Sequence, residues 1–282
     1  MKIPMTLESS VGDLIVVLMA REIVNGDFVI LGVGTPMAAA ALLLARATHA
    51  PLCDFFFNGA INPEIEDVSV SLLRPEEVYA RTDGFLSHRD IINQQQRGRV
   101  SLEFIRPVQV DAAGSINLSR IGDARKPKVR FPGSVAVPDS SVQFGRTILY
   151  VPQHDRRVFV GRLDFRSAAG HLEEGAWRKQ MGIIGGGPSK VITNLAVLGF
   201  DNEQRQLMLE TVHWGVSVEQ VEESTGFKLL HSPHLRQTLP PQPDELQVLS
   251  EEIDRHRIRD MEFKSMRSTV MDRLAQLSTT SH

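Results

Sequence analysis

A strand that runs into a helix through a glycine turn constrains this sequence most. Residues 27–34, DFVILGVG, are mainly β-branched, aromatic and apolar, with little polar alternation. This composition is typical of a strand covered on both faces. Thr35 and Pro36 then supply an N-cap and a proline at the first helical position, and an alanine- and leucine-rich stretch follows. A buried strand followed at once by a helix predicts an α/β fold with parallel strands.

The alternation of helices and strands continues along the first half of the chain. The predicted elements are a helix over 6–25 that ends at Gly26, a strand over 53–60, a helix over 85–99 and a strand over 100–110. Residues 111–146 are richer in glycine, proline and charge, and predict a long loop excursion. We therefore expect a doubly wound, mostly parallel sheet wound in the right-handed sense.

The second half of the chain is richer in strands. The predicted elements are strands over 147–152 and 156–165, a hairpin of 190–201 with 205–214, a capped helix over 217–225, a proline-rich spacer over 233–243 and a charged helix from about Asp244. No proline- or serine-rich linker divides the two halves. The predicted domains are an α/β domain over 1–240 and a C-terminal helical extension over 241–282.

Charge and cysteine content limit the classes of function. A net charge of −3 and a pI near 6.3 give no overall attraction to nucleic acid or to anionic membranes. The single cysteine, Cys53, excludes an internal disulfide framework, and the apolar run 14–20 is too short for a signal peptide or a membrane span. No GxSxG motif or metal-ligand spacing of histidines occurs. We expect a cytoplasmic protein that binds no metal, nucleic acid or membrane.

Two turns at strand ends carry candidate binding residues. In GVGTP (32–36), Gly32 and Gly34 let the backbone approach an anion or carbonyl, and Thr35 opens a helix with free N–H groups. In FFFNGA (55–60), the Asn58 amide could donate a hydrogen bond to a substrate oxygen beside Gly59. The alternatives are a structural tight turn in the first case, and an asparagine that tolerates positive φ in the second.

A polar segment over 109–134 contains a cluster of basic side chains. Its members are Arg120, Arg125, Lys126, Lys128 and Arg130. Such a cluster could bind the phosphates of a nucleotide-like carrier. The alternative is a solvated charged loop. The glycine-rich segment 182–190 could close over a pocket or simply connect two strands.

Taken in order, these stretches resemble the β subunit of family I CoA-transferases, from about Val11 to Phe227. The most specific motif is Gln109-Val-Asp-x-x-Gly114-x-x-Asn117, followed by Ile121-Gly-Asp and a Pro-Lys-x-Arg-Phe-x-Gly-Ser run that ends at Ser134. The resemblance implies pairing with a CoA-transferase-like α subunit in a heterodimer or heterotetramer. It also implies a coenzyme A ester as substrate and no tightly bound cofactor.

The departures from the family pattern concern the chemistry. Transferases of this family carry a nucleophilic glutamate just after the second strand, and the residue aligned with it here is Phe57, which cannot act as a nucleophile. Arg106-Pro107, Val135 and Ala136 stand where the family has glycines, so we expect a narrowed or reshaped pocket. The resemblance implies pocket residues Gly32, Gly34, Thr35, Phe57, Asn58, Gly59, Gln109 and Asn117, and CoA-binding residues Arg120, Lys126 and Arg130.

Three hypotheses follow for the role of the chain. The first is a pocket-forming β subunit whose α partner supplies the nucleophile or base. The chain is similar to two diverged relatives, a myxobacterial-type glutaconyl-CoA decarboxylase and a hydrolase that opens steroid rings as CoA esters. The second hypothesis is a non-catalytic scaffold or regulatory subunit, and the third is a transferase that uses Glu64 or Glu66. The acyl group and the reaction, whether transfer, hydrolysis or decarboxylation, stay open.

Overall fold

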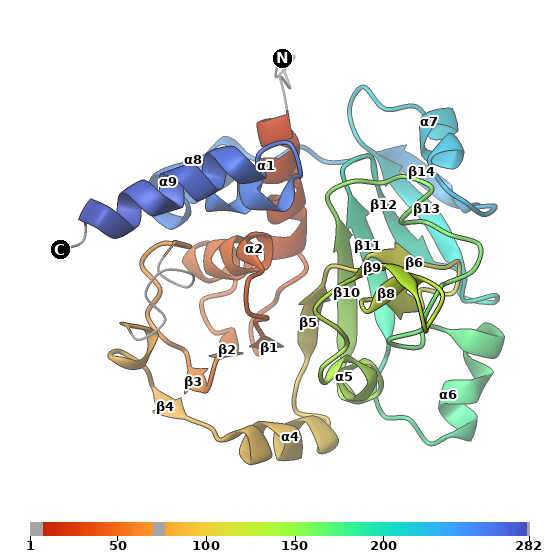
Figure 1. Cartoon of the computed structure of the whole chain (residues 1–282), viewed down its shortest axis with the longest axis horizontal. Helices are drawn as coiled ribbons and strands as arrows, with labels where there is room; N and C mark the ends of the chain where they lie inside the picture. Colours follow the sequence, from red (N-terminus) through yellow and green to blue (C-terminus); the bar gives the residue numbers. More distant parts are fainter. Residues whose placement is uncertain (1–7, 70–76, 281–282) are drawn as a thin grey trace. The chain divides into compact units, whose positions relative to one another are not determined.

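The computed structural model of the chain describes residues 8–69 and 77–280 and divides into two compact units. Unit 1 contains the chain up to Ile92 together with the segment from Pro240 onward, and unit 2 contains Asn93–Leu239. The predicted α/β class, with a strand-rich second half and a C-terminal helix, is confirmed (Figure 1). The predicted division into 1–240 and 241–282, as separate domains, stays a prediction.

Unit 1 begins with the predicted alternation of helix and strand. Its N-terminal elements are α1 (Glu8–Ala20), β1 (Phe28–Ile30), α2 (Pro36–Ala47), β2 (Asp54–Phe57), β3 (Ala60–Ile61), the 3₁₀ turn η1 (Glu77–Tyr79), β4 (Gly84–Phe85) and the start of α4 (His88–Gln96). Strand β1 pairs with β2 in parallel, and β2, β3 and β4 pair in antiparallel order. Gly26 has the predicted left-handed conformation, with φ 86°, but it lies in the turn before β1 and not at the helix end, because α1 already ends at Ala20.

The C-terminal segment completes unit 1. Its elements are α8 (Pro243–Val248), the π-helical turn η3 (Leu249–Ile253), the 3₁₀ turn η4 (Ile258–Glu262) and α9 (Arg267–Thr280). In Figure 1 these blue elements lie beside α1 and α2, which η4 contacts directly.

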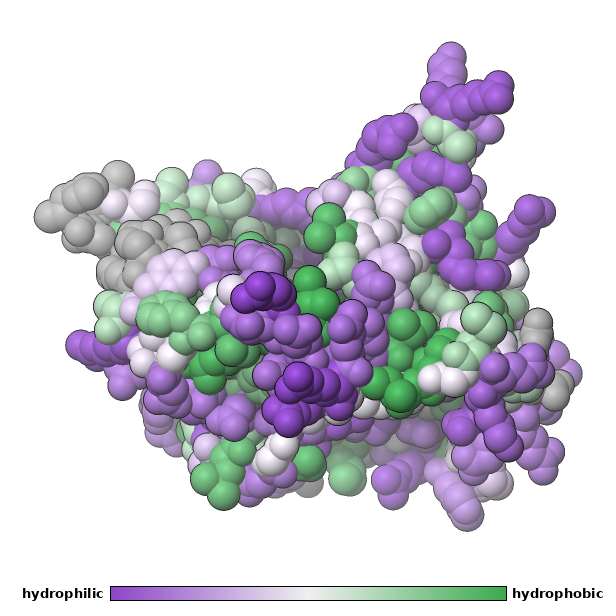
Figure 2. Space-filling view, turned by 90° about the horizontal axis from the view of Figure 1, so that it is seen from below, coloured by the Kyte–Doolittle hydropathy of each residue, from purple (hydrophilic) through white to green (hydrophobic). Residues whose placement is uncertain are grey.

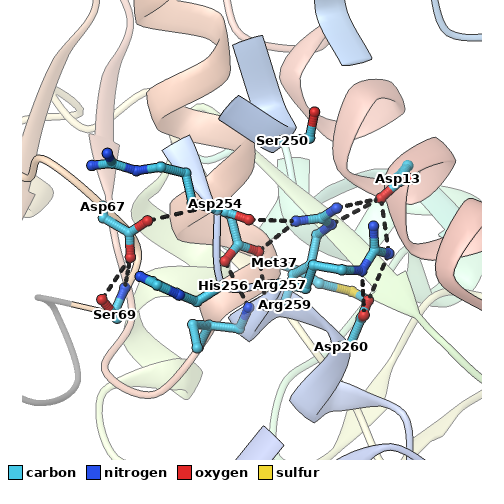
Figure 3. A network of polar contacts seen from close by, with 12 residues as sticks. Asp13, Met37, Asp67, Ser69, Ser250, Asp254, His256, Arg257, Arg259 and Asp260 are labelled. Atoms are coloured by element: carbon cyan, nitrogen blue, oxygen red, sulfur yellow. Dashed lines mark hydrogen bonds and ion pairs between the residues drawn. The ribbon is translucent and has the colours of Figure 1, made fainter. Parts of the chain in front are cut away.

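A buried ionic network holds this C-terminal segment to α1. The Arg259 side chain is fully buried and donates hydrogen bonds to Asp13 (Nη2 to Oδ1, 2.6 Å) and to Asp254 (Nη1 to Oδ2, 2.7 Å), as Figure 3 shows. Burial alone would lower the pKa of Arg259, but the charges of Asp13 and Asp254 outweigh it and raise that pKa. The guanidinium therefore stays charged and binds both ends of unit 1 together.

Unit 2 contains most of the strands. Its elements are β5 (Leu102–Ile105), β6 (Gln109–Val110), β7 (Ile116–Asn117), β8 (Arg120–Gly122), β9 (Pro127–Arg130), α5 (Val137–Gln143), β10 (Arg146–Val151), η2 (Leu172–Gly175), α6 (Ala176–Gln180), β11 (Pro188–Thr193), β12 (Ala196–Phe200), β13 (Leu207–Val212), α7 (Val218–Glu223) and β14 (Leu230–Gln237). Strands β5, β10 and β11 pair in parallel, whereas β11, β12 and β13 pair in antiparallel order. β14 pairs with β13 in parallel. Small hairpins, β6–β7 and β8–β9, occupy the predicted excursion 111–146 and the residues just before it.

Three predicted elements of unit 2 differ from the structure. The stretch 190–201, predicted as one arm of a hairpin, contains most of β11 and all of β12, which pair with each other, whereas the predicted hairpin is formed by β12 and β13. The stretch 156–165 forms no strand beyond a single bridge at Phe159. The Asp155 carboxylate accepts the N–H groups of Arg157 (2.8 Å) and Val158 (3.2 Å), which bends the backbone into a turn. The predicted spacer 233–243 begins inside β14, where Pro233 is tolerated because the strand lies at the sheet edge.

The buried network predicts a large effect of one substitution. Arg259→Ala leaves Asp254 buried without its cation, and should lower the free energy of unfolding by about 3–5 kcal/mol. Urea denaturation followed by circular dichroism measures this. Arg255→Ala, four residues earlier in the same segment and exposed, is the control and should change stability by no more than about 0.5 kcal/mol. Equal effects of the two substitutions would contradict the assigned role of Arg259.

Candidate functional site

The turn between β1 and α2 binds a carboxylate from its own chain. The Thr35 hydroxyl donates to the Gly32 carbonyl (2.7 Å), and Gly34 has a φ of 72°. The first free amide of α2, Met37 N–H, donates to the buried Glu262 carboxylate at 2.9 Å. The anion expected at this helix start is therefore supplied, at least at this amide, by the C-terminal segment.

The turn between β2 and β3 is a two-residue hairpin. Phe57 pairs with Ala60, and Asn58 (φ 49°) and Gly59 (φ 98°) both have positive φ, as in a type I′ turn. The Phe57 side chain is buried, with 2% exposure, whereas Asn58 is exposed. The Tyr79 hydroxyl donates to the Asn58 carbonyl at 2.7 Å. The Asn-Gly pair thus has the backbone conformation that explains its presence without a ligand.

Glu64 and Glu66, the alternative nucleophiles, lie on the surface of unit 1. Both carboxylates pair with Arg81, at 3.0 Å and 3.6 Å, and all three side chains are exposed. Among the described residues, neither carboxylate lies at a strand end, where a nucleophile would be held in a fixed position.

Gln109 and Asn117 form a buried polar network in unit 2. Asn117 Nδ2 donates to Gln109 Oε1 (2.8 Å) and to the Arg120 carbonyl (2.7 Å). Gln109 Nε2 donates to Asp164 Oδ2 at 2.7 Å, and its Oε1 accepts the Asp164 N–H at 3.0 Å. The two amides connect the start of β8 to the loop at 162–164 and use most of their hydrogen-bonding groups in doing so.

A pocket of about 500 Å³ lies between these two connected segments. Arg120, residues 122–124 and residues 162–164 line it. The Arg120 guanidinium lies over the Phe165 ring, 5.3 Å from its centroid, and also donates to the Gly122 carbonyl. Of the predicted CoA-binding residues, Arg120 alone lines this pocket. Arg130 is its cross-strand partner, and Lys126 lies in the exposed turn of the β8–β9 hairpin.

The loop before α5 keeps a backbone conformation that favours glycine. Ala136 has a φ of 61°, although alanine is disfavoured there, and the Val135 side chain is 90% exposed. The Ser134 hydroxyl lies 2.6 Å from that of Ser167, which accepts the Leu118 N–H at 2.8 Å. Hydroxyl contacts therefore fix this loop to the strand region near β7.

The glycine-rich segment 182–190 begins exposed, at Gly182 and Ile184, but its three consecutive glycines at 185–187 are tightly packed within unit 2. Gly185 N–H donates to the Val142 carbonyl (2.9 Å), and a Cβ on either Gly185 or Gly186 would clash with backbone atoms. The buried Arg178 guanidinium donates to the carbonyls of Ser141 (2.6 Å) and Gly185 (3.2 Å). These contacts favour the connecting role over that of a lid.

One buried carboxyl in unit 2 was not predicted from the sequence. Glu103 on β5 lies opposite Thr147 on β10. Glu103 Oε2 and Thr147 Oγ1 are buried and have no hydrogen-bond partner within the described residues. Burial raises the pKa of Glu103 to about 7, and a hydrogen bond with Ser140 offsets only part of this effect. Glu103 therefore changes charge near neutral pH.

Other classes of site have little support. Within residues 8–69 and 77–280, no group of three or more His, Cys, Asp or Glu side chains could hold a metal ion. Cys53 is buried. No helix in the described part of the chain is both long and apolar enough to cross a membrane. Apolar side chains do reach the surface, including Val135 and Phe85, and Figure 2 shows apolar residues among hydrophilic ones on the face that it draws.

The sequence matches known proteins over most of its length. Residues 14–224 match the family model described as coenzyme A transferase. The B subunit of the 3-oxoadipate CoA-transferase of Pseudomonas knackmussii is 32% identical over 85% of this chain and 92% of its own. The B subunit of the glutaconate CoA-transferase of Acidaminococcus fermentans is 29% identical over 84% of this chain and 90% of its own. The cholesterol ring-cleaving hydrolase IpdB subunit of Mycobacterium tuberculosis is 26% identical over 82% of this chain and 89% of its own.

Solved structures agree with these sequence relatives. The glutaconate coenzyme A-transferase from Acidaminococcus fermentans superposes with a TM-score of 0.78 at 26% identity, covering 87% of this chain and 95% of that one. The structure of the decarboxylase AibA/AibB superposes with a TM-score of 0.77 at 27% identity, covering 89% of this chain and 97% of that one. The predicted fold type and the predicted family resemblance are both confirmed.

Sequence reasoning missed Arg162, Tyr79 and Glu103. Arg162 and Glu103 each come near their neighbours only through strand pairing or loop packing between distant segments. The one signal for Tyr79 was its aromatic character, which by itself indicates burial more often than a contact with a turn.

The raised pKa of Glu103 predicts a pH-dependent effect of substitution. The folded state holds this proton more tightly than the unfolded state, so the stability it contributes is present at low pH and is lost as pH rises from about 4.5 through 7. The loss is on the order of 3 kcal/mol. Glu103→Gln should therefore stabilise the protein at pH 8 relative to pH 5. Urea unfolding at both pH values measures this, with Glu203→Gln, on an exposed turn, as control. The same effect at both pH values would contradict the titration.

Proposed function

Because this chain belongs to the coenzyme A transferase family, we propose that it is the β subunit of a heteromeric enzyme that acts on a CoA thioester. In this proposal the chain shapes the acyl-CoA pocket and the α partner supplies the nucleophile or base. The support for a β role is that the relatives covering 82–85% of this chain are named as B subunits of CoA-transferases or as the IpdB subunit of a hydrolase.

The observation that carries the missing-nucleophile part is Phe57. The family resemblance aligns this residue with the catalytic glutamate, and here it is a buried phenyl group at the end of β2, directly before the Asn58-Gly59 turn. Neither turn residue offers a nucleophile. The exposed, Arg81-paired Glu64 and Glu66 are poor substitutes, because their carboxylates are not held at a strand end.

The reaction could be transfer, hydrolysis or decarboxylation, since the similar proteins include enzymes named for each. The same phenyl group also favours a second candidate function, a non-catalytic scaffold or regulatory subunit of a CoA-transferase-like complex. The two candidates differ in one measurable property. A chain that forms the pocket binds the CoA ester, whereas a scaffold binds only its protein partner.

The β8–β9 hairpin is the proposed contact for the CoA phosphates. Arg120, Lys126 and Arg130 are assigned to this role. Lys126 and Arg130 are exposed, and Arg120 lines the pocket of unit 2. Guanidinium and ammonium groups bind phosphates through charge-assisted hydrogen bonds.

If the partner supplies the nucleophile, no residue of this chain should become acylated. The complex co-purified with the product of the adjacent gene is supplied with candidate acyl-CoA esters and treated with hydroxylamine or borohydride during turnover. Mass spectrometry of the tryptic peptides should find no modification in this chain. A modified Glu64 or Glu66 peptide would overturn the proposal in favour of a transferase with its own nucleophile.

Removing a phosphate contact should weaken CoA-ester binding. Arg120→Ala, Lys126→Ala and Arg130→Ala, made separately, should each cost on the order of 1.5–3 kcal/mol where the contact is real, a ten- to hundred-fold loss of affinity. Calorimetry measures binding, and size-exclusion chromatography of the same samples measures assembly with the α partner. Unchanged affinity in all three variants, with assembly intact, would favour the scaffold function. Weakened assembly alone would assign the hairpin to the interface with the α partner.

A further inference from the structure

We infer that the pocket between the β8–β9 hairpin and residues 162–164 holds the phosphorylated nucleoside end of the ligand, with Arg162 as a phosphate-binding residue beside Arg120. This inference rests on the proposed function, since it names the part of a CoA ester that occupies this pocket. The sequence resemblance did not single out Arg162.

The two arginines differ in how much of their hydrogen-bonding capacity is in use. The Arg120 guanidinium lies over the Phe165 ring and donates to the Gly122 carbonyl. The backbone carbonyl of Arg120 accepts a hydrogen bond from the Asn117 side chain, which holds the residue in place. Arg162 is exposed and, within the described part of the chain, makes no hydrogen bond or ion pair. A guanidinium has five N–H donors and binds phosphate in bidentate fashion. Arg162 therefore brings unused donors to a pocket whose other cation is already positioned.

The pocket is also lined by two aspartates, Asp123 and Asp164, and each already accepts hydrogen bonds from the protein. The N–H groups of Arg125 (2.8 Å) and Lys126 (3.2 Å) donate to Asp123 Oδ1, and these bonds lower the pKa of Asp123. Asp164 Oδ2 accepts from Gln109. A carboxylate has about four acceptor positions, so each retains capacity for a further donor. Both are exposed acceptors beside the two guanidinium groups.

This mixture of charges selects among ligand classes. A bare anion such as inorganic phosphate would gain from the arginines but would be repelled by the carboxylates. A phosphorylated nucleoside presents phosphate oxygens to the arginines and hydroxyl or amino donors to the aspartates. The volume of about 500 Å³ is within the range of small-molecule sites. The pocket chemistry thus fits the adenosine bisphosphate portion of a CoA ester better than it fits the acyl portion.

The test uses fragments of the ligand and one arginine variant. The full chain, alone and in complex with its α partner, is titrated calorimetrically with adenosine 3′,5′-bisphosphate, with pantetheine, with inorganic phosphate and with an intact CoA ester. Arg162→Gln should weaken binding of the bisphosphate and of the CoA ester ten- to hundred-fold and leave pantetheine binding unchanged, and Arg162→Lys should restore part of the loss. Arg97→Gln, an exposed arginine just after α4 and outside the pocket, is the matched control and should have no effect.

The outcomes separate this inference from the proposed function. If the CoA ester binds with equal affinity to Arg162→Gln and to the unmodified protein, the inference is wrong and the proposed function stands. The inference is also wrong if inorganic phosphate binds as tightly as the bisphosphate. Arg162-dependent binding of the bisphosphate without any turnover of CoA esters would support the pocket and contradict the proposed enzyme.

Discussion

Unit 1 depends on the fully buried Arg259. Its guanidinium lies between Asp13 of α1 and Asp254 of the C-terminal segment, and a charge in such a place is stable only when both carboxylates are present. The same segment then brings Glu262 to the first free amide of α2. The glycine turn after β1 is therefore held in place by residues more than two hundred positions away, and the charge that a ligand would bring to that amide is already there.

Unit 2 contains buried polar side chains that bond mostly to one another, although Glu103 Oε2 and Thr147 Oγ1 have no hydrogen-bond partner within the described residues. His154 contacts the hydroxyls of Thr193 (3.1 Å) and Thr225 (3.0 Å) and stacks on the Phe159 ring. Burial lowers the pKa of His154 to about 3, so the ring stays neutral in the folded state at any moderate pH. Gln109 and Asn117 also use most of their hydrogen-bonding groups within unit 2. Arg162 differs from these groups, because it lines the pocket of unit 2 and makes no hydrogen bond or ion pair within the described part of the chain.

The sequence could predict features that depend on neighbours along the chain. Positive φ at Gly26 and at the Asn58-Gly59 turn, and the capping box of Ser217 and Gln220 in α7, all follow from local chemistry. The strand prediction for 156–165 was wrong because the Asp155 carboxylate bonds to nearby backbone N–H groups and bends the chain into a turn. Pairings such as Gln109 with Asp164, or Met37 with Glu262, were out of reach, since the partners lie 55 and 225 residues apart. The roles of the site residues depend on these distant pairings.

The chemistry at Phe57 follows from its burial as much as from its identity. A nucleophilic carboxylate must be ionised and accessible, and a side chain with 2% exposure at the end of β2 is neither hydrated nor open to a thioester. A glutamate in the same environment would have a raised pKa and would be a weak nucleophile at neutral pH. Phe57 therefore belongs to the apolar core at the end of β2, and the hairpin backbone beside it is a type I′ turn. A phenyl group held in this way contributes apolar packing at the strand end and has no atom that could act as a nucleophile.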